Sequence, residues 1–263
     1  MAQKTDFNAN GVVLWEGLSE IDGSPIVLIV TGLEKASANS KTGDLVQTWI
    51  LRSDMSPREA VNAGKDVAIC GTCPHKGTWN PILAKYEDRV CYVLIDNAPR
   101  QIFVAYSGGR YEIVTLAAGA EILRGRKVRL GAYGDPAAVP FYVWESLLAY
   151  VTQGTGYSHA WRYCDARLSQ WCMASADNAQ EGEEARARGW RSFRVGTYAE
   201  SLIRGTEFLC PASEQAGRKL NCAKCLACGG NELSPHKSSV FIPVHGGKGM
   251  VNAFNRKGDA TQP

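Results

Sequence analysis

The sequence of 263 residues has no run of about 18 apolar residues, which is the length that a membrane-spanning helix needs. Its first residues, MAQKTDFNANGVVLWEG, also lack the basic segment and apolar stretch of a secretory signal. We therefore expect a cytoplasmic protein with no membrane partner. The net charge of +3 is too small to predict a polyanionic partner.

Several motifs that are typical of particular enzymes or nucleotide-binding proteins are absent too. The sequence contains no G-x-S-x-G, H-E-x-x-H, P-loop or G-x-G-x-x-G pattern. These absences disfavour hydrolases with a nucleophile elbow, zinc proteases and common nucleotide-binding folds. With 45% hydrophobic and 21% charged residues, the chain can still bury a full core.

The chain does have nine cysteines, many of them at short spacings. Cytoplasmic thiols stay reduced, so the spacings favour metal binding over disulfides. The densest stretch is FLCPASEQAGRKLNCAKCLACGG, with the pattern C-x11-C-x2-C-x2-C formed by Cys210, Cys222, Cys225 and Cys228. Three thiolates at three-residue steps are typical of [4Fe-4S] ligation. A single zinc ion with four ligands and metal-free thiols remain alternatives.

A second set lies upstream, in AICGTCPHKGTWNP and RVCYVLI. Cys70 and Cys73 form a C-x2-C pair, which we expect at the end of a strand, and Cys91 completes three thiolates. If His75 is the fourth ligand, a closed structural zinc site results. If it is not, a three-thiolate centre keeps one open coordination position. Buried or free thiols without a metal remain an alternative for this set as well.

The remaining cysteines, Cys164 and Cys172, have no neighbour at ligand spacing, so we expect both to pack in the core. His236 and His245 lie near the downstream cysteines, and either could replace a thiolate or have no role.

The fold class that the pattern predicts is α/β, with a partial (β/α) barrel or an open parallel sheet at its centre. Three β-rich runs separated by turn residues predict an antiparallel meander, and a helix with a Ser56, Pro57 and Glu59 capping box follows. Strands, including VCYVLI at 90–95, then alternate with helices. We expect four parts: an N-terminal meander (1–55), an α/β core (56–204), a cysteine-rich metal-binding segment (205–247) and a flexible tail (248–263).

Polar residues follow several of the expected strands. Ligands of parallel α/β proteins bind at the carboxyl ends of the strands. Asp135 and His159 are therefore candidate catalytic residues, although a turn residue and an ordinary histidine are the simpler interpretations. Asp177 is interpreted first as a helix N-cap. The candidate cofactor-binding residues are Gly134, Asp135, Tyr157 and Arg162.

The stretches CGTCPHKGT, GYSHAWR, CMASADNAQEGEEARARGWRSFRV and FLCPASEQAGRKLNCAKCLACGG resemble a family of uncharacterised bacteriophage-encoded cysteine-rich proteins. The resemblance spans roughly residues 60 to 245 and implies a phage protein that works in the host cytoplasm.

A weaker similarity is to radical S-adenosylmethionine enzymes, which use a partial barrel and a three-cysteine [4Fe-4S] cluster. It implies that Cys70, Cys73 and Cys91 hold the cluster, that Asp135 in YGDP belongs to a glycine-acid motif, and that the downstream cysteines hold a second centre. The C-x2-C-x17-C spacing differs from the C-x3-C-x2-C loop usual in those enzymes.

Two functions follow from these patterns. The first is an iron-sulfur enzyme for redox or radical chemistry on a small molecule, nucleotide or nucleic acid, with S-adenosylmethionine as a candidate cofactor. The second is a non-catalytic module, stabilised by zinc, that binds nucleic acid or a host protein.

Overall fold

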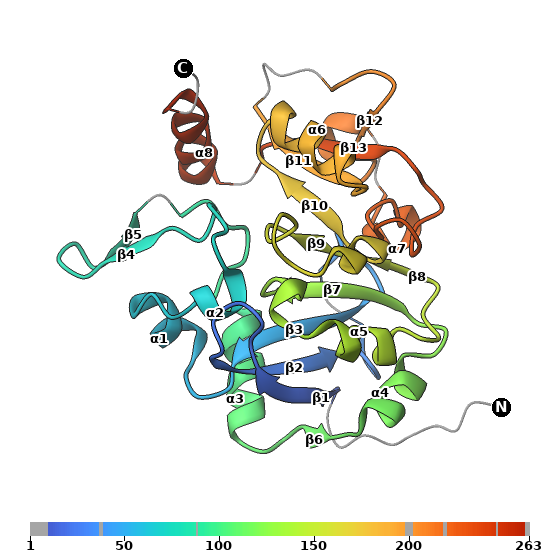
Figure 1. Cartoon of the computed structure of the whole chain (residues 1–263). Coiled ribbons are helices and arrows are strands. Elements are labelled where there is room, and N and C mark those ends of the chain that lie inside the picture. The colour runs from blue at the N-terminus through green and yellow to red at the C-terminus, as the bar shows by residue number, and fades with distance from the viewer. Residues whose placement is uncertain are drawn as a thin grey trace.

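The structure, a computed structural model, describes residues 10–36, 39–87, 89–197, 202–217, 220–245 and 247–260. It is mixed α/β, with a mixed sheet of six strands below a parallel sheet of five in Figure 1. The α/β class that the sequence predicts is confirmed. None of the described helices has the length and apolarity to cross a lipid bilayer.

The six-stranded sheet contains the predicted N-terminal meander. Its order is β6-β1-β2-β3-β7-β8. Neighbours β1, β2 and β3 pair antiparallel, whereas β3, β7 and β8 pair parallel. The meander is therefore one half of a larger sheet. The strands are β1 (Gly11–Leu18), β2 (Pro25–Thr31), β3 (Val46–Arg52), β6 (Glu112–Ile113), β7 (Lys127–Tyr133) and β8 (Gln153–Thr155).

The second sheet has the order β12-β13-β11-β10-β9, with every neighbouring pair parallel. Its strands are β9 (Tyr157–Ser158), β10 (Met173–Ala176), β11 (Ser192–Gly196), β12 (Glu207–Leu209) and β13 (Ser239–Pro243). Only Gly156 separates β8 from β9, so the chain passes directly between the sheets. A Cβ on Gly156 would lie 2.6 Å from the Cys172 sulfur, which explains the glycine.

The helices cover these sheets and their loops. They are α1 (Pro57–Asn62), α2 (Val67–Cys70), α3 (Ala98–Ser107), α4 (Leu116–Leu123), α5 (Phe141–Leu147), α6 (Ala179–Ala187), α7 (Cys222–Cys225) and α8 (Lys248–Ala260). Three short 3-10 helices span Pro136–Ala138, Ala166–Gln170 and Glu214–Ala216, and a hairpin joins β4 (Thr78–Asn80) to β5 (Lys85–Glu87). The capping box of α1 is present as predicted.

The core lies on the six-stranded sheet and continues beneath the second one. Cys172 is fully buried in it, and Cys164 packs against it partly exposed, in agreement with the core role predicted for both.

Two local predictions are wrong. Residues 90–95 form no strand, because their polar groups bond to other partners: Val90 N to His75 O, Val93 N to the Cys91 sulfur, and Val93 O to Arg89. Cys70 ends a short helix, α2, and does not follow a strand directly.

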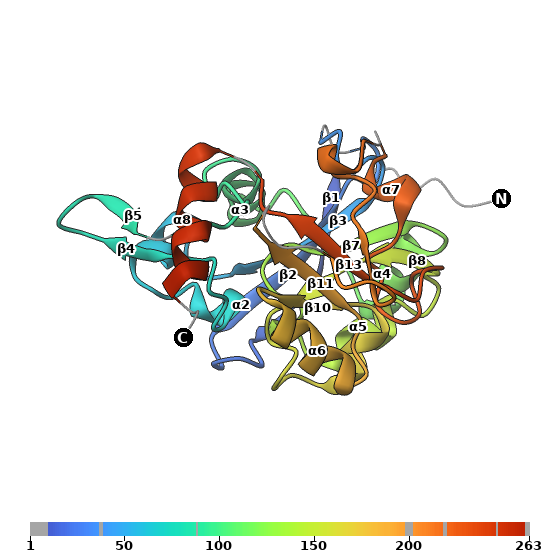
Figure 2. The same ribbon diagram turned by 90° about the horizontal axis from the view of Figure 1, so that it is seen from above.

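The segment expected to be a flexible tail contains α8, whose Ala253 and Phe254 are buried against Val90 and Val244. Figures 1 and 2 both place α8 on the same side of the molecule as α2 and the β4–β5 hairpin. The helix therefore lies over the segment that carries the upstream cysteines.

Candidate functional site

Both cysteine sets face one cavity of about 760 Å³. The upstream set and the downstream set are separated by more than a hundred residues, yet they lie on the walls of the same space. The cysteines that line it are Cys70, Cys73, Cys91, Cys210, Cys222, Cys225 and Cys228. Seven thiols around a single cavity are a concentration that a packed core does not require.

The cavity opens where parallel strands end. Asp135 follows β7, His159 follows β9, and Asp177 follows β10, and all three line the cavity. The carboxyl ends of β9 and β10 meet at one edge of the five-stranded sheet, and β7 of the six-stranded sheet ends at the same cavity, so residues distant in sequence converge there. His245, which follows β13, also lines the wall and contacts the Tyr92 ring.

The four downstream cysteines lie near one another. The thiolate charges of Cys210, Cys222 and Cys225 each act on Cys228, which is buried. Burial raises the pKa of Cys210 to about 11, although the nearby backbone amides of Ala212 and Ser213 oppose the rise. Backbone amides directed at sulfur are a common feature of metal thiolate sites.

Burial also raises the pKa of Cys228, and a hydrogen bond from the Tyr157 hydroxyl opposes the rise. This bond gives Tyr157, expected to bind a cofactor, a place beside the downstream thiols. The neutral thiols are favoured at physiological pH unless a cation binds them.

The loop that carries these cysteines is held by Arg191, which sequence reasoning missed. Its guanidinium is buried and donates to three carbonyls of the loop: Gly230 at 2.6 Å, Ala227 at 2.8 Å and Ser238 at 2.6 Å. Burial lowers the pKa of Arg191, and the Cys228 charge opposes the decrease. A buried cation beside the loop would offset the negative charge of a thiolate centre.

Two backbone hydrogen bonds fix the same loop. Cys222 N donates to Lys41 O at 2.8 Å, and Gly156 N donates to Cys228 O at 2.9 Å. Leu226, between two of the cysteines, has a φ of +52°, a left-handed conformation that is uncommon for a branched residue. The surrounding bonds hold this strained turn in place.

The upstream set is arranged similarly. The charges of Cys73 and Cys91 act on Cys70, and burial raises the pKa of both Cys70 and Cys91. The Cys91 sulfur accepts a hydrogen bond from Val93 N at 3.4 Å. Each set therefore contains a sulfur with a backbone amide nearby, two residues further along the chain.

The two metals that the sequence leaves open require different distances between their sulfur ligands. One zinc ion with bonds of about 2.3 Å holds its tetrahedral sulfurs only about 4 Å apart. In the described residues, the group found with three ligand atoms all within 4.8 Å of one another contains no sulfur. A [4Fe-4S] cluster places each thiolate on a different iron, so it fits more widely spaced sulfurs.

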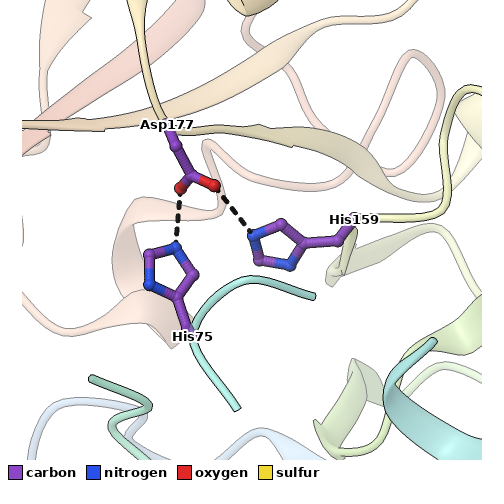
Figure 3. A group of neighbouring side chains, drawn as sticks. All are labelled: His75, His159 and Asp177. Atoms are coloured by element: carbon purple, nitrogen blue, oxygen red, sulfur yellow. Dashed lines mark hydrogen bonds and ion pairs between the residues drawn. The ribbon is translucent and has the colours of Figure 1, made fainter. Parts of the chain in front are cut away.

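The tightly spaced group consists of His75, His159 and Asp177 (Figure 3). His75 Nε2 donates to Asp177 Oδ1 at 2.6 Å, and His159 Nε2 lies 3.8 Å from Asp177 Oδ2. Burial raises the pKa of Asp177, but the two imidazoles outweigh it and the net change is downward. Burial lowers the pKa of His159, yet Asp177 and the Cys73 sulfur bring it well above its usual value.

The structure corrects the first interpretation of Asp177. Asn178 is the N-cap of α6, since its side chain accepts from Glu181 N at 2.8 Å. The Asp177 carboxylate is thus free to meet the two histidines. The sequence does not distinguish the two caps, since Asp177 is followed three residues later by Gln180 just as Asn178 is followed by Glu181.

Two other residues predicted from the sequence, Asp135 and Gly134, also line the cavity. Asp135 Oδ2 accepts from His159 N at 2.8 Å and Oδ1 from Ala137 N at 3.0 Å, so this buried carboxylate holds the loop that carries His159. Burial raises the pKa of Asp135. Gly134 has a φ of +83° and lines the cavity.

Two candidates lie apart from the cavity. Arg162 pairs with Glu184 at 2.9 Å and packs over the Trp161 ring. It is not one of the residues that line the cavity. His236 is exposed and contacts the Phe208 ring, so it lies outside the cavity wall as well.

Comparisons with known proteins give no relative: no family model, curated protein or solved structure matches the chain. The site must therefore be interpreted from its own geometry and chemistry.

Proposed function

We propose that this protein is an iron-sulfur enzyme whose two cysteine sets hold metal centres on the walls of one reaction cavity. The observation that carries the proposal is the position of all seven cysteines on the surface of a single cavity. Two unrelated structural zinc sites would have no reason to share a cavity large enough for a ligand.

The charges and the sequence spacing of the residues around the cysteines are compatible with iron-sulfur clusters. Cys210 and Cys228 are buried and the other five cysteines are partly buried. Arg191 and Arg129 place positive charge close to Cys228 and Cys222. Such charges favour a thiolate-ligated centre, which carries net negative charge. When bound, iron-sulfur centres of this kind transfer single electrons.

The upstream set supports an open coordination position. The Nε2 atom of His75, the candidate fourth ligand, is engaged by Asp177 at 2.6 Å. Three thiolates, Cys70, Cys73 and Cys91, then remain for that centre. We propose S-adenosylmethionine as the cofactor at the open position, since a cavity of about 760 Å³ lies within the usual range for small-molecule sites, about 300–1,000 Å³.

We further propose that the parallel strands of the two sheets act together as a partial barrel. The strands β3, β7 and β8 are parallel, as are β9 to β13, and the direct passage from β8 to β9 makes the series continuous along the chain. The cavity at their carboxyl ends is where such a barrel binds its ligands.

The substrate class follows from the proposal only broadly: a small molecule, a nucleotide or a nucleic acid segment that enters this cavity. The proposed setting is the cytoplasm of a host cell during phage infection, supported by the resemblance of the cysteine-rich stretches.

Anaerobic purification followed by metal and sulfide analysis tests the proposal. The wild type should be brown, absorb broadly near about 400 nm and contain iron with acid-labile sulfide. Colourless protein with two zinc ions would refute it and would favour the zinc-stabilised binding module. A titration with S-adenosylmethionine should change the spectrum of the wild type but not that of Cys73→Ser.

A further inference from the structure

We infer that His75, His159 and Asp177 form a second kind of metal site, a mononuclear centre for a divalent first-row ion bound through nitrogen and oxygen. It is distinct from the thiolate centres because it uses none of the seven cysteines. Two histidines and one carboxylate are the ligand set of sites that bind Fe²⁺ and keep several positions open.

The geometry brings three donors to one point from three parts of the chain. His75 comes from the loop after α2, His159 from the end of β9 and Asp177 from the end of β10. All three ligand atoms lie within 4.8 Å of one another. Figure 3 shows both imidazoles directed at the carboxylate, one toward each oxygen. A small separation of these side chains would admit an ion with bonds of about 2.0–2.2 Å.

A second observation, at His159, also indicates a cation-binding site. His159 Nε2 is buried and has no hydrogen-bond partner within the part of the chain that the structure describes. Its distance of 3.8 Å to Asp177 Oδ2 is too long for a hydrogen bond. A buried nitrogen that makes no hydrogen bond is costly, and a bound cation would satisfy it once its proton has left.

The surrounding residues fix the donors. Asp135 accepts from His159 N, and the Phe254 ring of α8 stacks on the His75 ring with centroids 5.8 Å apart. Because Asn178 caps α6, the Asp177 carboxylate is not needed for that helix. Fixed imidazoles on either side of a carboxylate that no helix cap requires are what a preorganised metal site needs.

Charge and position support a catalytic setting. Once metal binding has displaced the His159 proton, two neutral imidazoles and one carboxylate leave a divalent ion with one positive charge. The Cys73 and Cys91 thiolates lie close enough to act on His159. The three ligands line the cavity, so the open positions of the ion face the space where a substrate would bind.

Mn²⁺ is the probe of choice, because it binds nitrogen and oxygen ligands and has little affinity for thiolates. The full chain, purified anaerobically, is titrated with Mn²⁺ while the electron paramagnetic resonance signal of free Mn²⁺ is followed. The wild type should bind one equivalent. Asp177→Asn, nearly isosteric, and His159→Gln should weaken binding by about 100-fold or more, since changes in outer-shell partners alone cost about 10–100-fold.

His236→Ala is the matched control, because His236 is exposed and lies outside the cavity, and it should bind Mn²⁺ as the wild type does. Circular dichroism confirms that each variant is folded. Cys225→Ser should keep Mn²⁺ binding even if it loses iron, so the failure of one site is distinguishable from that of the other. Absence of Mn²⁺ binding by the wild type, or equal binding by Asp177→Asn, would overturn the inference.

Discussion

Replacing Arg191 with methionine should destabilise the cysteine-rich loop and reduce its metal content. The guanidinium donates to the carbonyls of Gly230, Ala227 and Ser238. Ala227 O also accepts from Ser234 Oγ, so it keeps a partner in the variant. Gly230 O and Ser238 O would lose the donors that the described residues give them.

The magnitude follows from the Gly230 carbonyl, because Gly230 is buried whereas Ser238 is exposed and water can replace its lost donor. A buried acceptor without a partner costs about 1–3 kcal/mol, so the free energy of unfolding should fall by about 1–3 kcal/mol. Methionine retains most of the apolar volume of the side chain, which limits any cavity contribution. The loss of the positive charge beside Cys228 should further weaken metal retention.

Urea unfolding followed by circular dichroism, with metal analysis of the same samples, measures both effects. Arg167→Met is the matched control: Arg167 is an exposed arginine that pairs with Asp165, and its loss should cost less than about 1 kcal/mol. If Arg191→Met unfolded within about 0.5 kcal/mol of the wild type and kept all its metal, the role assigned to Arg191 would be wrong.

Three further predictions concern single side chains. Cys225→Ser should lose one metal centre and part of the stability, because site formation and folding are coupled, and a variant with unchanged metal content would show that Cys225 is not a ligand. Cys164→Ala should keep every metal ion at a cost of about 1 kcal/mol, and loss of metal would identify Cys164 as a ligand. Burial raises the pKa of Glu207 but Arg194 lowers it further, to below its ordinary 4.5, so this buried pair should stabilise the fold above that pH and lose its effect below it. Glu207→Gln should therefore cost about 3 kcal/mol in urea unfolding at pH 7 and less at lower pH, whereas a cost independent of pH would contradict the assignment.

The elements that the sequence predicts well are those with a strong local pattern. The runs at β1, β2 and β3 are bounded by turn residues, and β7 agrees with the predicted KVRLGAY strand. The parallel pairing of β3 with β7 depends on contacts across some 80 residues and has no local signal.

Local pattern is also the reason for the errors. The apolar run at 90–95 has the composition of a strand. However, Arg89 donates to the Val93 carbonyl and the Val93 amide donates to the Cys91 sulfur, so neither group pairs with a neighbouring strand. Asp177 and Asn178 are both good caps by composition, and only the register of α6 decides between them.

The sequence predicts the members of each cysteine set but not that the two sets share one cavity. The spacing of each cysteine set identifies its members, but the convergence of both sets on one cavity depends on how the two sheets meet. The grouping of His75 with Asp177 requires the loop after α2 to reach the end of β10, which no sequence spacing encodes.

X-ray absorption at the iron and zinc edges of anaerobically purified protein is the most direct test of the central claim that the cysteines hold iron-sulfur centres. The account predicts an iron edge, a shell of sulfur neighbours and iron-iron scattering from a cluster. A zinc edge with four sulfur neighbours per ion and no iron would contradict it.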